Sequence, residues 1–263
     1  MTVPCNSKKA MTSDTQRILQ RQSCSALGAV EACFSDSDSS RRRFLEMTLG
    51  GALAGLVTAA GVKFATPHPV LAQSKLSPDA ALQELMDGNR RFTSGRLTAH
   101  EQDLAILKQN TVEKQEPFAA VLSCADSRVP VEMVFDQSIG HIFVTRVAGN
   151  VVTPEIIASL EYGAAVLGTK VILVMGHAGC GAVKATIQAK EVPGQISALY
   201  PHIQPAVDQA GPNLEAATKA NAKIQSALLR HASTVVAGLL KEGKLKVVAG
   251  YYDVASGAAT LLD

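Results

Sequence analysis

Three short, uninterrupted apolar runs are the feature that most narrows the possible fold of this chain. They span Phe118–Leu122, Ile142–Val147 and Val171–Met175, and segments with helical patterning lie between them. Continuous apolar runs of this length are typical of strands covered on both faces, as in parallel sheets. The segment Pro154–Leu167 has an apolar stripe after Thr-Pro, which predicts a helix that crosses between two parallel strands. The sequence therefore predicts an α/β fold with a mainly parallel central sheet and flanking helices.

Two further elements are expected at the two ends of this domain. The tripeptide Ser77-Pro78-Asp79 offers a helix N-cap followed by proline in the first turn, and an apolar stripe then runs as far as Gly88. Near the C-terminus, Lys246–Tyr252 follows further helical segments and is predicted to add an edge strand to the sheet.

The first 72 residues differ from the rest and are typical of an export leader. Three arginines, Arg41 to Arg43, precede Phe-Leu, uncharged residues follow from Met47 to Val62, and Ala72 offers a small residue for cleavage. This layout predicts a twin-arginine signal in residues 1–72, read by the export machinery, and a functional domain in residues 73–263, located in a periplasm or thylakoid lumen. A buried helix, an uncleaved membrane anchor and a misassigned start codon are the alternatives.

The charge of the expected mature domain argues against nucleic acid as a partner. Of the 25 Lys and Arg residues and 23 Asp and Glu residues, 8 and 5 precede residue 73, which leaves 17 against 18. With no basic excess and 4% aromatic residues, the domain has neither a surface that would neutralise phosphates nor aromatic platforms on which bases would stack.

Two loops at predicted strand ends contain metal-ligand side chains. Cys124 follows the first apolar run, and Gly-His177-Ala-Gly-Cys180-Gly follows the third. The carboxyl ends of parallel strands meet at one edge of a sheet, so we expect Cys124, His177 and Cys180 to converge there. Two cysteines and one histidine suit a zinc ion, one per chain, with the fourth tetrahedral position open as in catalytic sites. A disulfide between the two cysteines is the alternative in an oxidising compartment.

An acidic and a basic residue follow the first of these cysteines. Asp126 and Arg128 lie two and four residues beyond Cys124. A guanidinium can hold a carboxylate in one geometry, and such a carboxylate could orient a group bound to the metal. A plain loop salt bridge, or Asp126 as the fourth metal ligand, are the alternatives.

Several motifs together resemble the β-class carbonic anhydrases. They are C-A-D-S-R-V from Cys124, R-V-A-G-N-V from Arg146, L-E-Y-G from Leu160 and G-H-A-G-C-G from Gly176. The resemblance covers roughly residues 79–257. It implies an enzyme in which zinc-bound hydroxide converts CO₂ to bicarbonate and a proton, with Cys124, His177 and Cys180 as zinc ligands and Asp126 and Arg128 as a catalytic pair.

The resemblance also implies a substrate pocket. Gln115 matches the amide that orients substrate, Phe143, Ala148 and Gly181 match a small apolar pocket, and Tyr162 matches a tyrosine at the pocket edge. Related chemistry on CS₂ or COS, and a non-catalytic zinc-bound module that responds to bicarbonate, are the alternative functions.

Self-association and regulation are two further implications. Members of the family form homodimers or higher oligomers through an N-terminal helical arm, and Leu82–Phe92 resembles that arm. Its apolar stripe should be difficult to bury on a domain whose sheet faces are already covered, which also predicts association. Some members are inhibited when bicarbonate binds beside an arginine and a tryptophan; here Arg146 is present, but Val121 occupies the tryptophan position, so such inhibition should be weak or absent.

Overall fold

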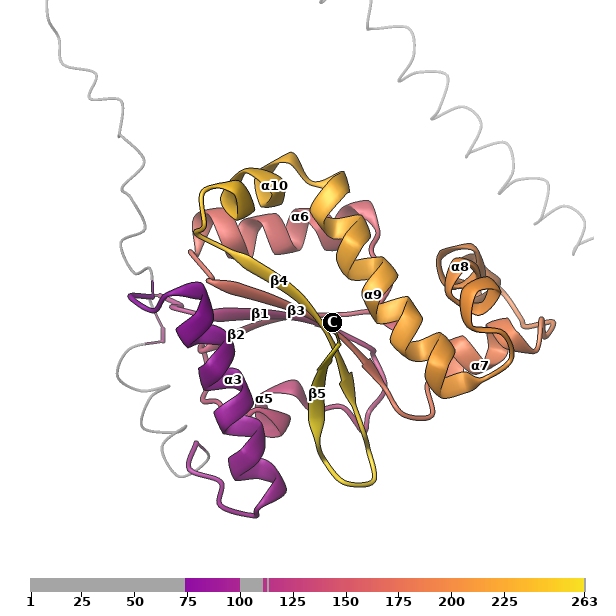
Figure 1. Ribbon diagram of the computed structural model, residues 1–263, viewed down its shortest axis with the longest axis horizontal. Coiled ribbons are helices and arrows are strands. Elements are labelled where there is room, and N and C mark those ends of the chain that lie inside the picture. Colours follow the sequence, from indigo (N-terminus) through magenta and orange to yellow (C-terminus); the bar gives the residue numbers. More distant parts are fainter. Residues whose placement is uncertain (1–73, 100–110, 113, 263) are drawn as a thin grey trace, which may run out of the picture. The chain divides into compact units, whose positions relative to one another are not determined.

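A single five-stranded sheet, in the order β2-β1-β3-β4-β5, forms the centre of the computed structural model (Figure 1). The structure describes residues 74–99, 111–112 and 114–262, and the following bounds refer to these residues. The strands are β1 (Ala119–Ser123), β2 (Ile142–Arg146), β3 (Val171–His177), β4 (Lys246–Tyr252) and β5 (Ala259–Leu262). The first four are parallel, and β5 is antiparallel to β4. The predicted mainly parallel α/β fold is confirmed.

The strand predicted at Lys246–Tyr252 exists, but its expected place at the sheet edge is wrong. This strand lies between β3 and β5, and β5 forms the edge after a turn at Gly257. The four-residue β5 pairs with the second half of β4 only, from Ala249 to Tyr252. Such a short strand has no clear apolar period, so the sequence pattern did not indicate it.

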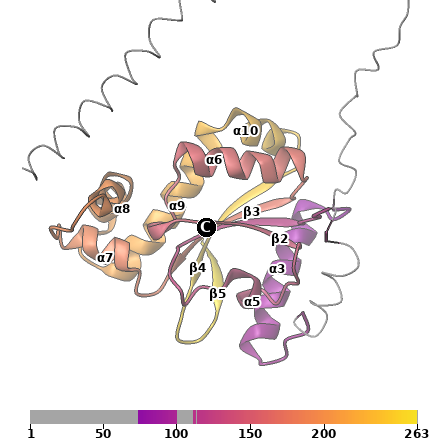
Figure 2. The same ribbon diagram turned by 180° about the vertical axis from the view of Figure 1, so that it is seen from behind.

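Helices cover both faces of the sheet (Figures 1 and 2). Helices α3 (Pro78–Thr93) and α5 (Val131–Val134) lie on one face. On the other face lie α6 (Pro154–Glu161), α9 (Leu214–Ala232) and α10 (Thr234–Lys241). Near the carboxyl ends of the strands lie η1 (Ala148–Asn150), α7 (Gly181–Ile187) and α8 (Tyr200–Ala210), with η3 (Ile196–Leu199) leading into α8.

The strands divide their side chains between the two apolar layers. On β1, Val121 belongs to the layer under α3 and α5, whereas Ala120 and Leu122 belong to the layer under α6, α9 and α10. All five β1 residues are buried, as expected of a central strand with helices on both faces. Because both faces of β1 are covered, its sequence is a continuous apolar run and does not alternate between apolar and polar residues.

The N-terminal helix is longer than its sequence pattern suggested, and its apolar face is covered in part within the chain. Helix α3 continues past Gly88 to Thr93. Gly88 does not end the helix but allows close packing, since a Cβ there would overlap the carbonyl oxygen of Phe135. Ala81 and Leu85 are fully buried in the layer against β1 and β3. Leu82 and Met86 of the same stripe are only partly buried, so the expectation that a second copy completes its burial stays a prediction.

The predicted crossover helix changes its winding before it ends. It is α-helical over Pro154–Glu161 and continues as a π-helical turn, η2 (Tyr162–Val166), before the glycine at 168. Gly163 within this turn packs closely on Phe143, since a Cβ at Gly163 would lie 3.1 Å from the Phe143 ring.

The expected export leader lies outside the described residues. Among the helices that the structure does describe, none has the length and hydropathy that crossing a membrane would require.

Candidate metal centre

The two ligand-bearing loops leave neighbouring strands at the same edge of the sheet. Strand β1 pairs with β3 in parallel, Ser123 opposite Met175, so that Cys124 leaves the sheet beside the end of β3. His177 is the last residue of β3, and Cys180 precedes the first turn of α7. Between them Gly179 has a φ of 68°, a left-handed conformation that folds the short loop back toward β1.

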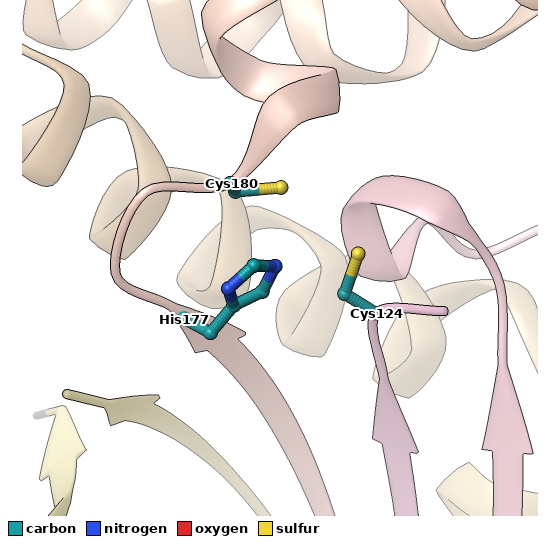
Figure 3. Close-up of side chains that lie close together, drawn as sticks. All are labelled: Cys124, His177 and Cys180. Atoms are coloured by element: carbon teal, nitrogen blue, oxygen red, sulfur yellow. The ribbon is translucent and has the colours of Figure 1, made fainter. Parts of the chain in front are cut away.

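Cys124, His177 and Cys180 are brought together as predicted (Figure 3). One ligand atom from each lies within 4.8 Å of the other two, and all three residues are buried. Figure 3 shows the imidazole ring directed between the two sulfur atoms. The cysteines are free thiols, so the alternative of a disulfide between them is not what the structure contains.

The imidazole of His177 is oriented by the backbone. Its Nδ1 lies 3.0 Å from the carbonyl oxygen of Ala178, which selects the tautomer with the proton on Nδ1. Its Nε2 is buried and has no hydrogen-bond partner. A buried imidazole nitrogen with its lone pair free and its opposite nitrogen held by a carbonyl is the arrangement found in metal-binding histidines.

The pairing of the two thiols shifts their pKa values in opposite directions. A hydrogen bond from Cys180, together with the Gly149 N–H, lowers the pKa of Cys124 despite its burial. The same pairing with Cys124, together with burial, raises the pKa of Cys180. Cys124 is therefore the thiol of the pair that ionises more readily, and a cation placed among these groups would favour ionisation of both.

This donor set fits zinc. Two sulfurs and one imidazole nitrogen are ligands that zinc prefers, and three protein ligands leave a tetrahedral position open. The orphaned Nε2 of His177 is explained if that atom binds a metal ion.

Asp126 and Arg128 form a bidentate pair beside the ligand cluster. Arg128 donates from Nε to Oδ1 at 2.9 Å and from its terminal nitrogen to Oδ2 at 2.8 Å, and its backbone N–H also donates to Oδ1. These bonds hold the pKa of Asp126 well below its usual range. The carboxylate lies 3.9 Å from Nε2 of His177. Both carboxylate oxygens accept hydrogen bonds from Arg128. The structure therefore shows Asp126 paired with the arginine, and not the alternative in which it is the fourth metal ligand.

Arg146 fixes the backbone of the same loop. From the end of β2, its guanidinium donates to the carbonyl oxygens of Cys124 at 3.0 Å and of Asp126 at 2.5 Å. Arg128 also reaches the other ligand loop, at 3.4 Å from the Gly179 carbonyl oxygen. Arg146 therefore fixes the backbone of the Cys124 loop, and Arg128 links that loop to the one with His177 and Cys180.

The expected pocket residues fall into two groups. Ala148 and Gly181 lie in segments that meet beside the cluster, since a Cβ on Gly149 would lie 3.3 Å from the Cβ of Ala182. Phe143 and Tyr162 contact each other, with ring centroids 6.3 Å apart, and Tyr162 is exposed.

Gln115 is exposed and precedes the amino end of β1, whereas Cys124 follows its carboxyl end. Phe143, the second residue of β2, also lies toward the amino ends of the strands. One chain therefore does not bring Gln115, Phe143 and Tyr162 to the cluster.

Gly149 is a site residue that the sequence interpretation missed. Its N–H donates to Sγ of Cys124 at 3.3 Å. The glycine stands within the R-V-A-G-N-V motif, but only the spatial proximity of η1 to Cys124 reveals the contact.

Comparisons with known proteins agree with this geometry. The family model "Carbonic anhydrase" matches residues 119–259. The carbonic anhydrase of Mycolicibacterium smegmatis is 33% identical over 196 residues, which cover 70% of this chain and 93% of that protein. The Coccomyxa β-carbonic anhydrase solved with acetazolamide is 25% identical, with a TM-score of 0.55 over 69% of this chain and 86% of that one.

A tetrameric β-carbonic anhydrase from Sordaria macrospora shares the fold at 20% identity, with a TM-score of 0.56 over 69% of this chain and 96% of that chain. The sequence match covers more than half of the chain and includes every residue of the Cys-His-Cys cluster. The chain therefore belongs to the carbonic anhydrase family and has the fold of its β-class.

Proposed function

We propose that the protein catalyses the reversible hydration of CO₂ to bicarbonate and a proton, with one zinc ion per chain held by Cys124, His177 and Cys180. The observation that carries the proposal is the buried cluster of two thiols and an imidazole beside an ionised Asp-Arg pair. Membership of the carbonic anhydrase family supports it independently. Neither the geometry of the site nor the family membership favours CS₂ or COS as substrate. The ordered carboxylate of Asp126 argues against a non-catalytic module, which would not need it.

Zinc supplies a Lewis acid that makes water a nucleophile near neutral pH. The chain's own contribution begins with the ligand loops, which exclude bulk water from the thiols and imidazole because all three side chains are buried. Gly149 and the backbone around His177 hold those ligands in their orientations.

Asp126 acts as a hydrogen-bond acceptor and not as a proton store. The hydrogen bonds from Arg128 hold the pKa of this carboxyl well below its usual range, which favours the ionised form at neutral pH. An ionised carboxylate accepts an O–H at Oδ1 or Oδ2 but cannot donate one. It would therefore accept a hydrogen bond only from a group that carries a proton, and would orient that group beside the ligand cluster.

Arg128 is a positioning residue for this carboxylate. Its planar fork meets both oxygens at once, which a lysine cannot do. Because its terminal nitrogen also approaches the Gly179 carbonyl oxygen, the fork places Asp126 relative to the loop of His177 and Cys180.

A homo-oligomer is part of the proposal. Gln115, Phe143 and Tyr162 lie away from the cluster of their own chain, so the pocket role that the resemblance implies for them requires a second copy. The tetrameric Sordaria protein of similar fold is compatible with such an assembly.

Residues 1–72 are proposed to direct export by the twin-arginine route before or without cleavage.

The test combines metal content with the CO₂ hydration rate of the full chain. We expect one zinc per chain, and we expect Asp126→Asn to retain that zinc while its hydration rate falls by about 10- to 100-fold. The matched control is Asp208→Asn, which makes the same chemical change on the exposed face of α8. A metal-free but active wild type, or a normal rate in Asp126→Asn, would refute the proposed mechanism.

A further inference from the structure

Helix α9 presents two buried amide side chains to the segment that follows Val147. Asn221 and Gln225 are one helical turn apart and are almost fully buried, at 0% and 1% exposure. Buried amides are costly unless their donors and acceptors are satisfied, so their partners indicate what they hold in place.

Both amides bind backbone of the segment from Gly149 to Val152. Asn221 donates from Nδ2 to the Gly149 carbonyl oxygen at 2.8 Å, and the Val152 N–H donates to Oε1 of Gln225 at 2.8 Å. Gln225 in turn donates to Oδ1 of Asn221 at 3.2 Å and to the His202 carbonyl oxygen at 2.9 Å. The second amide therefore orients the first.

The backbone held in this way is in a sparsely populated conformation. Gly149 and Asn150 have φ values of 76° and 44°, in the left-handed region. For Asn150 this conformation costs free energy, and it persists only where surrounding contacts enforce it. The peptide group between the two residues is held at both ends, at its oxygen by Asn221 and at its N–H by the Val147 carbonyl oxygen, 2.9 Å away.

The consequence reaches the metal ligand. The N–H of Gly149, on the other side of the same Cα, donates to Sγ of Cys124 at 3.3 Å. If Gly149 lost the anchor on its carbonyl oxygen, a shift of its Cα would carry the N–H away from Sγ of Cys124, and the sulfur would lose this donor.

We propose that Asn221 is a positioning residue of the metal centre: from α9 it anchors Gly149 by its carbonyl oxygen, and so keeps the N–H of the same residue in place to donate to Sγ of Cys124. This inference rests on the proposed role of Cys124 as a zinc ligand. A donated N–H withdraws electron density from the sulfur, which lowers the energy of its lone pairs and keeps the thiolate in one orientation toward the metal.

The test uses the full chain loaded with cobalt(II) in place of zinc, together with zinc affinity measured by competition with a chelator. The substitution Asn221→Leu keeps a similar volume but removes the amide donor. We expect the thiolate-to-cobalt charge-transfer band to move to longer wavelength, and zinc affinity to fall by about tenfold. Gln225→Leu should shift both readouts in the same direction by less, because Gln225 acts through Asn221.

Thr218→Val is the matched control on the same helix. Thr218 is equally buried, but its hydroxyl donates within α9 to the Leu214 carbonyl oxygen, and valine keeps the methyl group that packs near Gly176. Both readouts should stay at their wild-type values in this variant.

The outcomes separate this inference from the proposed function. A wild type without any thiolate charge-transfer band would overturn the ligand assignment and this inference with it. A wild-type band that Asn221→Leu leaves in place, with zinc affinity within twofold, would overturn only the role of Asn221. Should Asn221→Leu fail to fold, Gln225→Leu decides by the same two readouts, and unchanged values there would also refute the inference.

Discussion

Replacement of Asp136 by asparagine should lower the free energy of unfolding by about 2 kcal/mol without changing any metal ligand. Asp136 follows α5, and its carboxylate is completely buried. It accepts a bond from Nε of Arg91 at 2.6 Å and three more from Thr98 and Ala99. One carboxylate thus holds the end of α3 and the following segment on the domain.

The magnitude follows from the pKa of this group. Burial alone would raise the pKa of Asp136, but the bonds from Arg91, Ala99 and Thr98 outweigh it and lower the pKa from 3.8 to about 2. Each pKa unit between the folded and unfolded states corresponds to about 1.4 kcal/mol, so the ionised form contributes about 2 kcal/mol. Since the folded pKa is the lower one, this stability is present above pH 3.8 and is lost as the pH falls toward 2.

The assay is urea unfolding of the zinc-loaded full chain and of Asp136→Asn, at neutral pH and at steps down to about pH 3. The difference between the two proteins should be about 2 kcal/mol at neutral pH and should narrow below pH 3.8, because the unfolded wild type then binds a proton at Asp136 that the folded protein does not yet bind. Release of zinc at low pH affects both proteins and cancels in the difference.

Asp208→Asn, an exposed change of the same kind, should have no measurable effect. A difference below about 0.5 kcal/mol at neutral pH, or one that does not vary with pH, would refute the reasoning about Asp136.

Three other predictions concern different parts of the chain. Cys180→Ser should lose zinc and activity together, and stoichiometric zinc in that variant would contradict the ligand set. Gly88→Ala should lower the melting temperature despite the better helix propensity of alanine, because its Cβ overlaps the Phe135 carbonyl oxygen; an unchanged or higher melting temperature would contradict this packing. Replacement of Arg41, Arg42 and Arg43 by lysine should retain the protein in the cytoplasm, as measured by cell fractionation. Normal export of this variant would show that the twin-arginine interpretation is wrong.

The parallel sheet and the Cys-His-Cys cluster could be predicted because both depend on local patterns. A strand buried on both faces must be apolar along its length, and parallel strands must end at one edge, so the order of the residues was enough to place Cys124 and His177 side by side. The helix at Pro78 was equally evident from its cap. How much of its apolar stripe one chain buries could not be predicted, because the pattern of one helix does not reveal how much room the sheet face leaves for it.

The positioning of the cluster could not be predicted in the same way, because it depends on pairs of residues that are distant in sequence. Asn221 and Gly149 are 72 residues apart, and a buried asparagine in an amphipathic helix looks in sequence like any other polar position. The sequence therefore specifies which atoms bind the metal within two short motifs, whereas the orientation of those atoms depends on the docking of α9 against η1. A carbonic anhydrase motif grafted onto another parallel sheet would keep its ligands but lack this second contribution, and zinc affinity is the property that should reveal the difference.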